Sequence, residues 1–138
     1  MQAPSSTGIY LFDLFGRFRL DRRIGVLCGR DERGVFMPLA MGSRALDVLG
    51  VLVERPGELV SRAEILTAVW PGVAVEDNNL NVQIGALRQV LDEGRPGSSC
   101  IQTIRGRGYR FSASVTQVVL QSQSHRRPRR LSLRGVDG

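Results

Sequence analysis

The sequence of 138 residues contains no lysine, so that all 19 of its basic residues are arginines. It has only two cysteines, Cys28 and Cys100, and a single histidine, His125. This set offers no ligand spacing typical of a metal site and no nucleophile–base pair, which argues against an enzyme. We therefore predict no metal and no cofactor, and we expect both cysteines to be small core residues in a reducing compartment.

Long hydrophobic runs are also missing. No apolar stretch approaches the roughly 20 residues that a membrane-spanning helix needs. The N-terminal residues MQAPSSTG lack the charged-then-apolar pattern of a signal peptide. We expect a cytoplasmic chain with no membrane contact, or the soluble piece of a larger protein. With 42% hydrophobic residues, the chain suits one modest core followed by a tail.

The positive charge is unevenly distributed. The net charge is +6, but residues 125–138 hold five Arg and one Asp, which leaves +2 for residues 1–124. Arginine favours bidentate contact with phosphate or guanine, although genome base composition explains its excess over lysine equally well. Within residues 1–124, Arg105, Arg107 and Arg110 fall within six positions. A nearly neutral domain still binds nucleic acid if such charges lie on one face.

The N-terminal part shows a β pattern. We expect residues 1–7 to be disordered and four short strands to follow at residues 9–12, 15–20, 24–28 and 35–39, separated by breaks rich in Asp, Gly and Arg. In the second strand, Phe18 and Leu20 share one face while Arg17 and Arg19 share the other. The pattern predicts an antiparallel sheet with one covered face.

Three helices are expected after the strands. The first begins with Ser43 as its N-cap and stops before Pro56-Gly57. The second begins with a capping box, in which Ser61 is followed three positions later by Glu64, and it ends at Pro71-Gly72, with Trp70 in the core. The third runs from about Asn78 to Leu91, after a cap at Asp77 or Asn78.

The third helix has two distinct faces. At 100° per residue its apolar stripe consists of Leu80, Ile84, Leu87 and Leu91. The opposite face carries no charge, whereas a solvated helix face usually carries Glu and Lys or Arg. This pattern indicates a surface shaped to meet a partner. The outer residues are Asn78, Asn79, Val82, Gly85, Ala86 and Gln89, with Gln83 toward one flank.

A β-hairpin is predicted after the helices. The runs Cys100–Arg105 and Tyr109–Phe111 alternate around a tip of Gly106, Arg107 and Gly108. The two glycines fit turn geometry; a phosphate cradle is a minor alternative, because no P-loop lysine is present. Residues 116–138 are interpreted as a linker or tail, whose arginines are either solvated or add nonspecific attraction to phosphate.

Together these elements are suited to bind double-stranded DNA. A helix fits the major groove of B-DNA and its outward side chains reach base edges. A hairpin beside it places arginine in the neighbouring minor groove, where narrow A·T stretches concentrate negative potential. The N–H groups at the start of the second helix, after Ser61, are suited to bind a phosphate.

Three segments in this order carry a resemblance. They are RPGELVSRAEILTAVW (residues 55–70), NNLNVQIGALRQVL (78–91) and IQTIRGRGYRF (101–111). Over residues 9–115 the chain resembles the DNA-binding domain of OmpR/PhoB-type response regulators. This implies an α+β fold, a winged helix-turn-helix with an N-terminal four-stranded antiparallel sheet, three helices and a C-terminal β-hairpin wing. The domain is expected at residues 8–115, followed by the tail at 116–138.

The resemblance also implies roles for individual residues. Val82 and Ala86 occupy base-facing positions of the recognition helix, and Asn79 and Gln83 lie where the family makes phosphate or base contacts. Thr103 has a phosphate-contact position, and Arg105 has the place of the wing arginine in the minor groove. Arg88 could pair with Asp92 four residues on or contact phosphate. The full set of expected DNA contacts is Ser61, Asn78, Asn79, Val82, Gln83, Ala86, Arg88, Thr103, Arg105 and Arg107.

The sequence departs from the family where many members have arginine on the recognition helix, because it has Gly85 and Ala86 there. Asn79 and Gln83 could instead read adenine, or Val82 and Ala86 could pack on thymine methyl groups. The acidic receiver domain that usually precedes this module is not in the sequence. In this the chain resembles membrane-anchored and multidomain regulators whose DNA-binding domain is N-terminal.

The expected function is sequence-specific binding of double-stranded DNA and regulation of transcription, as a module of a phosphorelay or one-component signalling protein. The resemblance suggests two further partners: RNA polymerase, through the Pro71–Asp77 loop, and a second copy of the chain in a weak head-to-tail dimer on DNA. The alternative is a winged helix used for protein–protein contact. Binding that weakens steeply with salt would favour DNA.

Overall fold

The computed structural model describes residues 8–93 and 99–121. The expected disorder of residues 1–7 and the arginine-rich stretch after residue 125 lie outside this range. The chain divides into two compact units, one of residues Phe12–Gln117 and one of Met1–Leu11 with Val118–Gly138. In the described part, no helix has both the length and the apolar character needed to cross a membrane.

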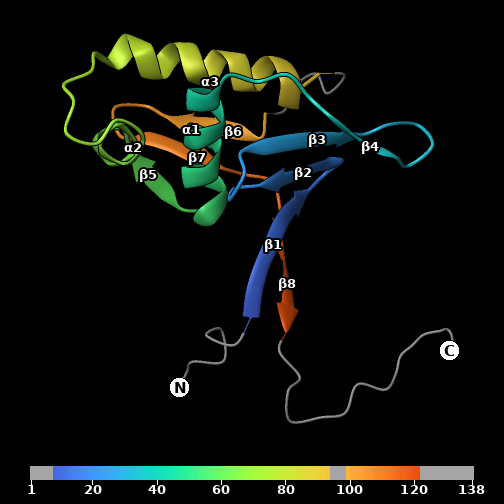
Figure 1. Cartoon of the computed structure of the whole chain (residues 1–138). Coiled ribbons are helices and arrows are strands. Elements are labelled where there is room, and N and C mark those ends of the chain that lie inside the picture. Colours follow the sequence, from blue (N-terminus) through green and yellow to red (C-terminus); the bar gives the residue numbers. More distant parts are fainter. Residues whose placement is uncertain (1–7, 94–98, 122–138) are drawn as a thin grey trace, which may run out of the picture. The chain divides into compact units, whose positions relative to one another are not determined.

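Four N-terminal strands form the expected antiparallel hairpins (Figure 1): β1 Gly8–Phe15, β2 Phe18–Asp21, β3 Val26–Arg30 and β4 Phe36–Pro38. The expected break after residue 12 is wrong, because the chain reverses only at Gly16-Arg17. Phe15 pairs with Phe18 there, and Gly16 takes a positive φ of 56°. Phe15, Phe18 and Leu20 are all buried, so the apolar side chains of this hairpin belong to the core.

A fifth strand extends this sheet. Residues Thr116–Gln121 form β8, and the strand order is β4-β3-β2-β1-β8. The expected four-stranded sheet thus has one strand more, and its fifth strand begins in the segment that was interpreted as a linker or tail. The reason lies in the segment TQVVLQ, whose β-branched residues favour an extended strand once a neighbouring edge is free to pair.

The three expected helices are present, with shifted starts. Helix α1 spans Ser43–Glu54, and its N-cap is Gly42, not Ser43. Helix α3 spans Asp77–Leu91, and its N-cap is Glu76, one position before the expected cap; neither start has a side-chain cap bond. Helix α2, Arg62–Val69, begins with the predicted capping box of Ser61 and Glu64, which is confirmed in both directions.

The wing belongs to a second sheet that the sequence only partly predicted. The expected hairpin is confirmed as β6, Ile101–Ile104, and β7, Gly108–Phe111. A short strand β5, Leu59–Ser61, which was not expected, pairs with β7 in the order β5-β7-β6. Gly108 is required there: a Cβ at this position would contact the carbonyl oxygen of Val60 and lie 2.8 Å from the Cα of Ser61.

One core supports the helices and the wing. The predicted stripe of α3 is confirmed, since Leu80, Ile84, Leu87 and Leu91 are all buried together with Phe111 of β7. Trp70 packs against this core but is only half-buried, with the Arg44 guanidinium 5.9 Å from its ring centre. The two cysteines are buried and free, as expected of core residues.

Candidate nucleic-acid interface

The outer face of α3 is exposed and uncharged, as its pattern predicted. Val82 keeps 57% of its surface accessible, which is a large exposed fraction for an apolar side chain. A Cβ on Gly85 would meet nothing within 4 Å, so this position is open to a partner. The exposed members of this face are Asn78, Asn79, Val82, Gly85 and Gln89, while Gln83 and Ala86 are half-buried toward its flank.

The wing tip presents two free guanidinium groups. Arg105, Gly106 and Arg107 form the turn between β6 and β7, closed by a hydrogen bond of 2.9 Å from the Arg107 N–H to the Ile104 carbonyl. Gly106 adopts a φ of 73°, which favours glycine. Within the described residues, the Arg105 and Arg107 side chains have no hydrogen bond and no ion pair, and both residues are exposed. These groups are therefore available to an anion.

Arg88 does not form the ion pair with Asp92 that was one of its two expected roles. Its Nη2 donates to the Ile101 carbonyl at 2.7 Å and to the Thr103 hydroxyl at 2.8 Å. The Asp92 carboxylate instead accepts from the Ser99 hydroxyl at 2.6 Å and from the Cys100 N–H at 3.1 Å. Arg88 and Thr103, both expected at DNA, are thus brought together by a direct bond between helix and wing.

Ser61 is engaged in capping α2. Its hydroxyl accepts the Glu64 N–H at 3.0 Å, while the Glu64 carboxylate accepts the Ser61 N–H at 2.9 Å. Arg55 adds an ion pair of 3.0 Å to the same carboxylate. The backbone N–H of Ser61 and the Arg55 guanidinium lower the pKa of Glu64 below its ordinary value, which keeps this carboxylate charged. A phosphate at this helix end would have to bind beside that negative charge.

A polar cluster lies at the start of α2 and α3, and the sequence patterns did not predict it. Arg62 donates from Nη1 to the Tyr109 hydroxyl and from Nη2 to Asn81 Oδ1, both at 2.9 Å. Its Nε lies 3.5 Å from the Asp77 carboxylate. Asn81 precedes Arg88 by seven residues, so helical spacing places both on one flank of α3. This spacing could have indicated that Asn81 belongs to the same contact surface as Arg88. Nothing local in the sequence indicates that Tyr109 meets both.

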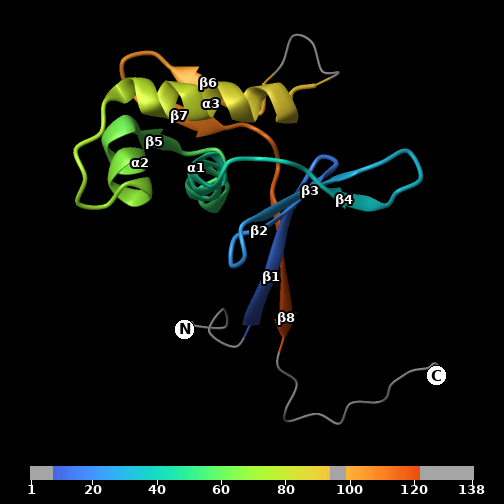
Figure 2. The same ribbon diagram turned by 45° about the horizontal axis from the view of Figure 1, so that its top comes forward.

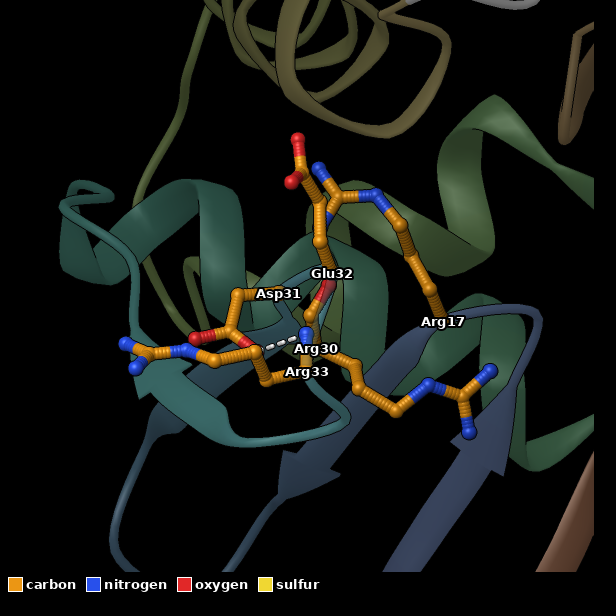
Figure 3. A pocket seen from close by; sticks show the side chains of 5 residues that line it. All are labelled: Arg17, Arg30, Asp31, Glu32 and Arg33. Carbon is orange, nitrogen blue, oxygen red and sulfur yellow. Dashed lines mark hydrogen bonds between the residues drawn. The ribbon is translucent and has the colours of Figure 1, made fainter.

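A second group of arginines lies at the turns of the N-terminal sheet, where Figure 3 shows Arg17, Arg30 and Arg33 around Asp31 and Glu32. Arg17 Nη1 donates to the Arg30 carbonyl at 3.2 Å. One oxygen of Asp31 accepts the N–H of Arg33 at 2.8 Å and therefore holds the turn. Two carboxylates accompany the three guanidinium groups here. The wing tip, which has no carboxylate in its turn, is the stronger candidate for binding a polyanion.

The arrangement brings the wing and α3 to one side of the same core. Figures 1 and 2 show β6 and β7 running beside α3, and the Arg88 bonds to β6 join them directly. The structure thus presents an uncharged helix face next to a positively charged turn. Within residues 8–93 and 99–121, no three His, Cys, Asp or Glu side chains are grouped to hold a metal ion.

Comparison with known sequences identifies the same region. A family model described as "Transcriptional regulatory protein, C terminal" matches residues 37–111. The phosphate regulon transcriptional regulatory protein PhoB of Escherichia coli (strain K12) is 40% identical over 76 residues, which are 54% of this chain and 33% of PhoB. The cholera toxin transcriptional activator of Vibrio cholerae is 29% identical over 109 residues, 78% of this chain and 36% of that protein. This chain spans about a third of the length of these relatives.

Solved structures share the architecture. The DNA-binding domain of CadC from E. coli matches with a TM-score of 0.67 at 24% identity, over 78% of this chain and 97% of that one. The RstA DNA-binding domain of Klebsiella pneumoniae, solved in complex with the RstA box, matches with a TM-score of 0.58 at 25% identity, over 72% of this chain and 94% of that one. The predicted α+β winged-helix fold is confirmed by these likenesses.

Proposed function

Since the chain belongs to the family of transcriptional regulatory protein C-terminal domains, the OmpR/PhoB-type DNA-binding domains, we propose that it reads duplex DNA with α3 in the major groove and the wing in the minor groove. It is a DNA-binding domain of a transcriptional regulator. The observation that carries the proposed geometry is the exposed, uncharged face of α3 beside the two unpaired arginines of the wing turn.

The helix supplies base reading without charge. Asn79 and Gln83 carry amide groups, which bind adenine through its N6 and N7 positions. Val82 and Ala86 offer apolar contact to thymine methyl groups, and Val82 is exposed enough to make it. Asn78, in the first turn of the helix, is exposed and well placed for a backbone phosphate. The preferred operator should therefore be rich in A·T pairs under the helix.

The wing supplies most of the electrostatic attraction. Arg105 enters the minor groove, and Arg107 binds a phosphate beside it. Thr103 and Ser61 add contacts to the sugar–phosphate backbone, each from a hydroxyl that already accepts an internal hydrogen bond and still has its own proton to donate. Arg88 contributes through its bonds to the wing strand β6.

Two further partners are proposed from the family resemblance. The loop after α2 is largely exposed, and within it Val73 keeps 62% of its surface accessible; this loop is proposed to contact RNA polymerase. Two copies are proposed to bind tandem sites head to tail, with weak association in the absence of DNA. The chain acts at DNA in the cytoplasm as the output module of a signalling protein, and it carries no catalytic activity of its own.

The competing function is docking of a partner protein through the same face. To separate the two, bound fragments would be selected from random and genomic DNA, and the selected duplex titrated at two salt concentrations. We expect a preferred sequence and an affinity that falls steeply with salt, with a log–log slope of about −0.9 for each phosphate contact. Salt-insensitive binding, or no duplex binding at low salt, would favour the protein-docking function.

A further inference from the structure

Two side chains on one flank of α3 reach the wing. Asn81 and Arg88 are seven residues, or about two turns, apart, and at 100° per residue they point in nearly the same direction. Both lie away from the outer face formed by Val82 and Gln89, and both bond to the hairpin. The recognition helix is therefore fastened to the wing at two levels along its axis.

The first fastening is at β6. The Arg88 guanidinium donates to the Ile101 carbonyl from Nη2 at 2.7 Å and from Nε at 3.2 Å, and Nη2 also reaches the Thr103 hydroxyl. Hydrogen bonds from an ionised donor are stronger and more directional than neutral ones. A single planar group thus holds two residues of the strand that leads directly into the wing turn.

The second fastening is at β7. Asn81 Oδ1 accepts from the Tyr109 hydroxyl at 3.2 Å and from Arg62 Nη2 at 2.9 Å. Arg62 also donates to the Tyr109 hydroxyl, and its guanidinium lies 5.6 Å from the centre of that ring. Tyr109 is only 4% exposed, so the bonded hydroxyl is fixed by a buried ring. This cluster ties α2, α3 and the wing strand at one point.

The wing tip has no such restraint of its own, because Arg105 and Arg107 have no side-chain partner in the described chain. We propose that Arg88 and the Arg62–Asn81–Tyr109 cluster are positioning groups: they hold the wing at a fixed angle to α3, so that one rigid body engages the major and the adjacent minor groove together. The inference rests on the proposed function, and it goes further by assigning Arg88 a role that acts through Arg105. Preorganisation of this kind raises affinity by reducing the ordering that binding must impose.

Direct contact of Arg88 with phosphate is the competing explanation, and a double-mutant cycle separates the two. If Arg88 acts through the wing, which also carries Arg107, its removal matters less once Arg105 is absent. If Arg88 binds a phosphate itself, the two losses multiply. If Arg88 only stabilised the fold, Arg88→Ala would lower the thermal midpoint of unfolding, and its effect on DNA affinity would not depend on Arg105.

The experiment measures affinity for a duplex selected from random DNA, for Arg88→Ala, Arg105→Ala and the double variant. We expect Arg88→Ala to weaken binding roughly tenfold, and the loss in the double variant to be smaller than the product of the two single losses. Arg88→Lys, which can still donate to the Ile101 carbonyl, should recover part of the loss. The base preference under α3 should stay the same in Arg88→Ala.

Two further variants keep the test decisive. Tyr109→Phe leaves the buried ring in place and removes only the hydroxyl, so it should show the same coupling to Arg105 if Arg88→Ala folds poorly. Arg110→Ala is the matched control, because Arg110 bonds Gln102 on the other side of the hairpin and should not couple. The inference would be overturned if the affinity losses of Arg88→Ala and Arg105→Ala multiply in the double variant, or if Arg88→Ala loses no affinity. An Arg105→Ala variant that binds normally would instead contradict the proposed minor-groove contact.

Discussion

The outer face of α3 and the turn of the wing lie next to each other and have opposite chemistry. The helix offers amides and small apolar groups with no charge on its outer face, whereas the wing turn offers two guanidinium groups and no carboxylate. An arginine-bearing recognition helix would combine attraction and base reading in one element. In the proposed function the two tasks are divided, so affinity and specificity should change separately.

The division depends on a shared support. Leu87 below the helix and Phe111 below the wing strand belong to the same buried cluster, and neither has measurable exposure. The helix–wing bonds of Arg88 then fix the two regions relative to each other. Two chemically different surfaces can act together because one rigid core carries both.

The largest effect is expected from breaking this common support. Leu87→Ala and Phe111→Ala each remove a fully buried side chain and should lower the free energy of unfolding by about 2–5 kcal/mol. Both variants should unfold in a single transition, measured by urea denaturation with circular dichroism. Separate transitions for helix and wing would show that the two regions do not share one core.

The next effect concerns the two glycines of the wing. Gly108→Ala places a Cβ against the Val60 carbonyl and should cost about 1–3 kcal/mol through overpacking between β5 and β7. Gly106→Ala is the matched control, because its Cβ would meet nothing within 4 Å and only its φ of 73° is unfavourable. Thermal unfolding should therefore rank Gly108→Ala as the less stable variant. An equal or reversed ranking would contradict the close approach of β5.

A smaller and more selective effect is expected on the helix face. Asn79→Ala and Gln83→Ala should each reduce discrimination at one base pair roughly tenfold, while leaving affinity for unrelated DNA unchanged. Fragment selection repeated with each variant measures this preference. Gln89→Ala, which changes another exposed amide of the same face, is the control. Unchanged preferences in both variants would mean that other side chains read the bases.

The smallest effect is a pH dependence at the start of α2. The folded-state pKa of Glu64 is lowered by the Ser61 N–H and by Arg55, so its stabilisation is present at neutral pH and is lost as pH falls through that lowered value. Glu64→Gln keeps an acceptor for the Ser61 N–H but does not titrate. The stability difference between the two proteins should shrink below about pH 4.3. A difference in stability that stays constant with pH would show that folding does not lower the pKa of Glu64.

Local patterns predicted a large part of this molecule. The capping box of Ser61, the buried stripe of α3 and the Gly106–Gly108 turn each depend on residues close in sequence, and all three are confirmed. The amide-rich outer face of α3 followed from the same helical periodicity. The helix starts were displaced by one residue because Gly42 and Glu76 cap through backbone geometry alone.

What the sequence could not predict depends on distant partners. Strand β5 forms because Val60 pairs with Tyr109 of β7, which is 49 positions away along the chain. The buried Asp13 forms an ion pair of 2.8 Å with Arg22, which the sequence analysis did not predict. The bonds of Arg88 to β6 were not among its two expected roles, an ion pair with Asp92 or a phosphate contact, because they depend on a strand that lies elsewhere in the sequence. Pairings of this kind require the tertiary fold, so they escape local pattern analysis.

The division between helix and wing is tested most directly by the salt dependence of binding. Affinity for the selected duplex would be measured over a series of salt concentrations for the parent, for Arg105→Ala with Arg107→Ala, and for Asn79→Ala with Gln83→Ala. The wing variant should have a log–log slope shallower by roughly 1 to 2, because each lost phosphate contact removes about 0.9. The helix variant should keep the parent slope and lose its sequence preference. If the helix variant had the shallower slope and the wing variant kept the parent slope, the proposed division between helix and wing would be contradicted.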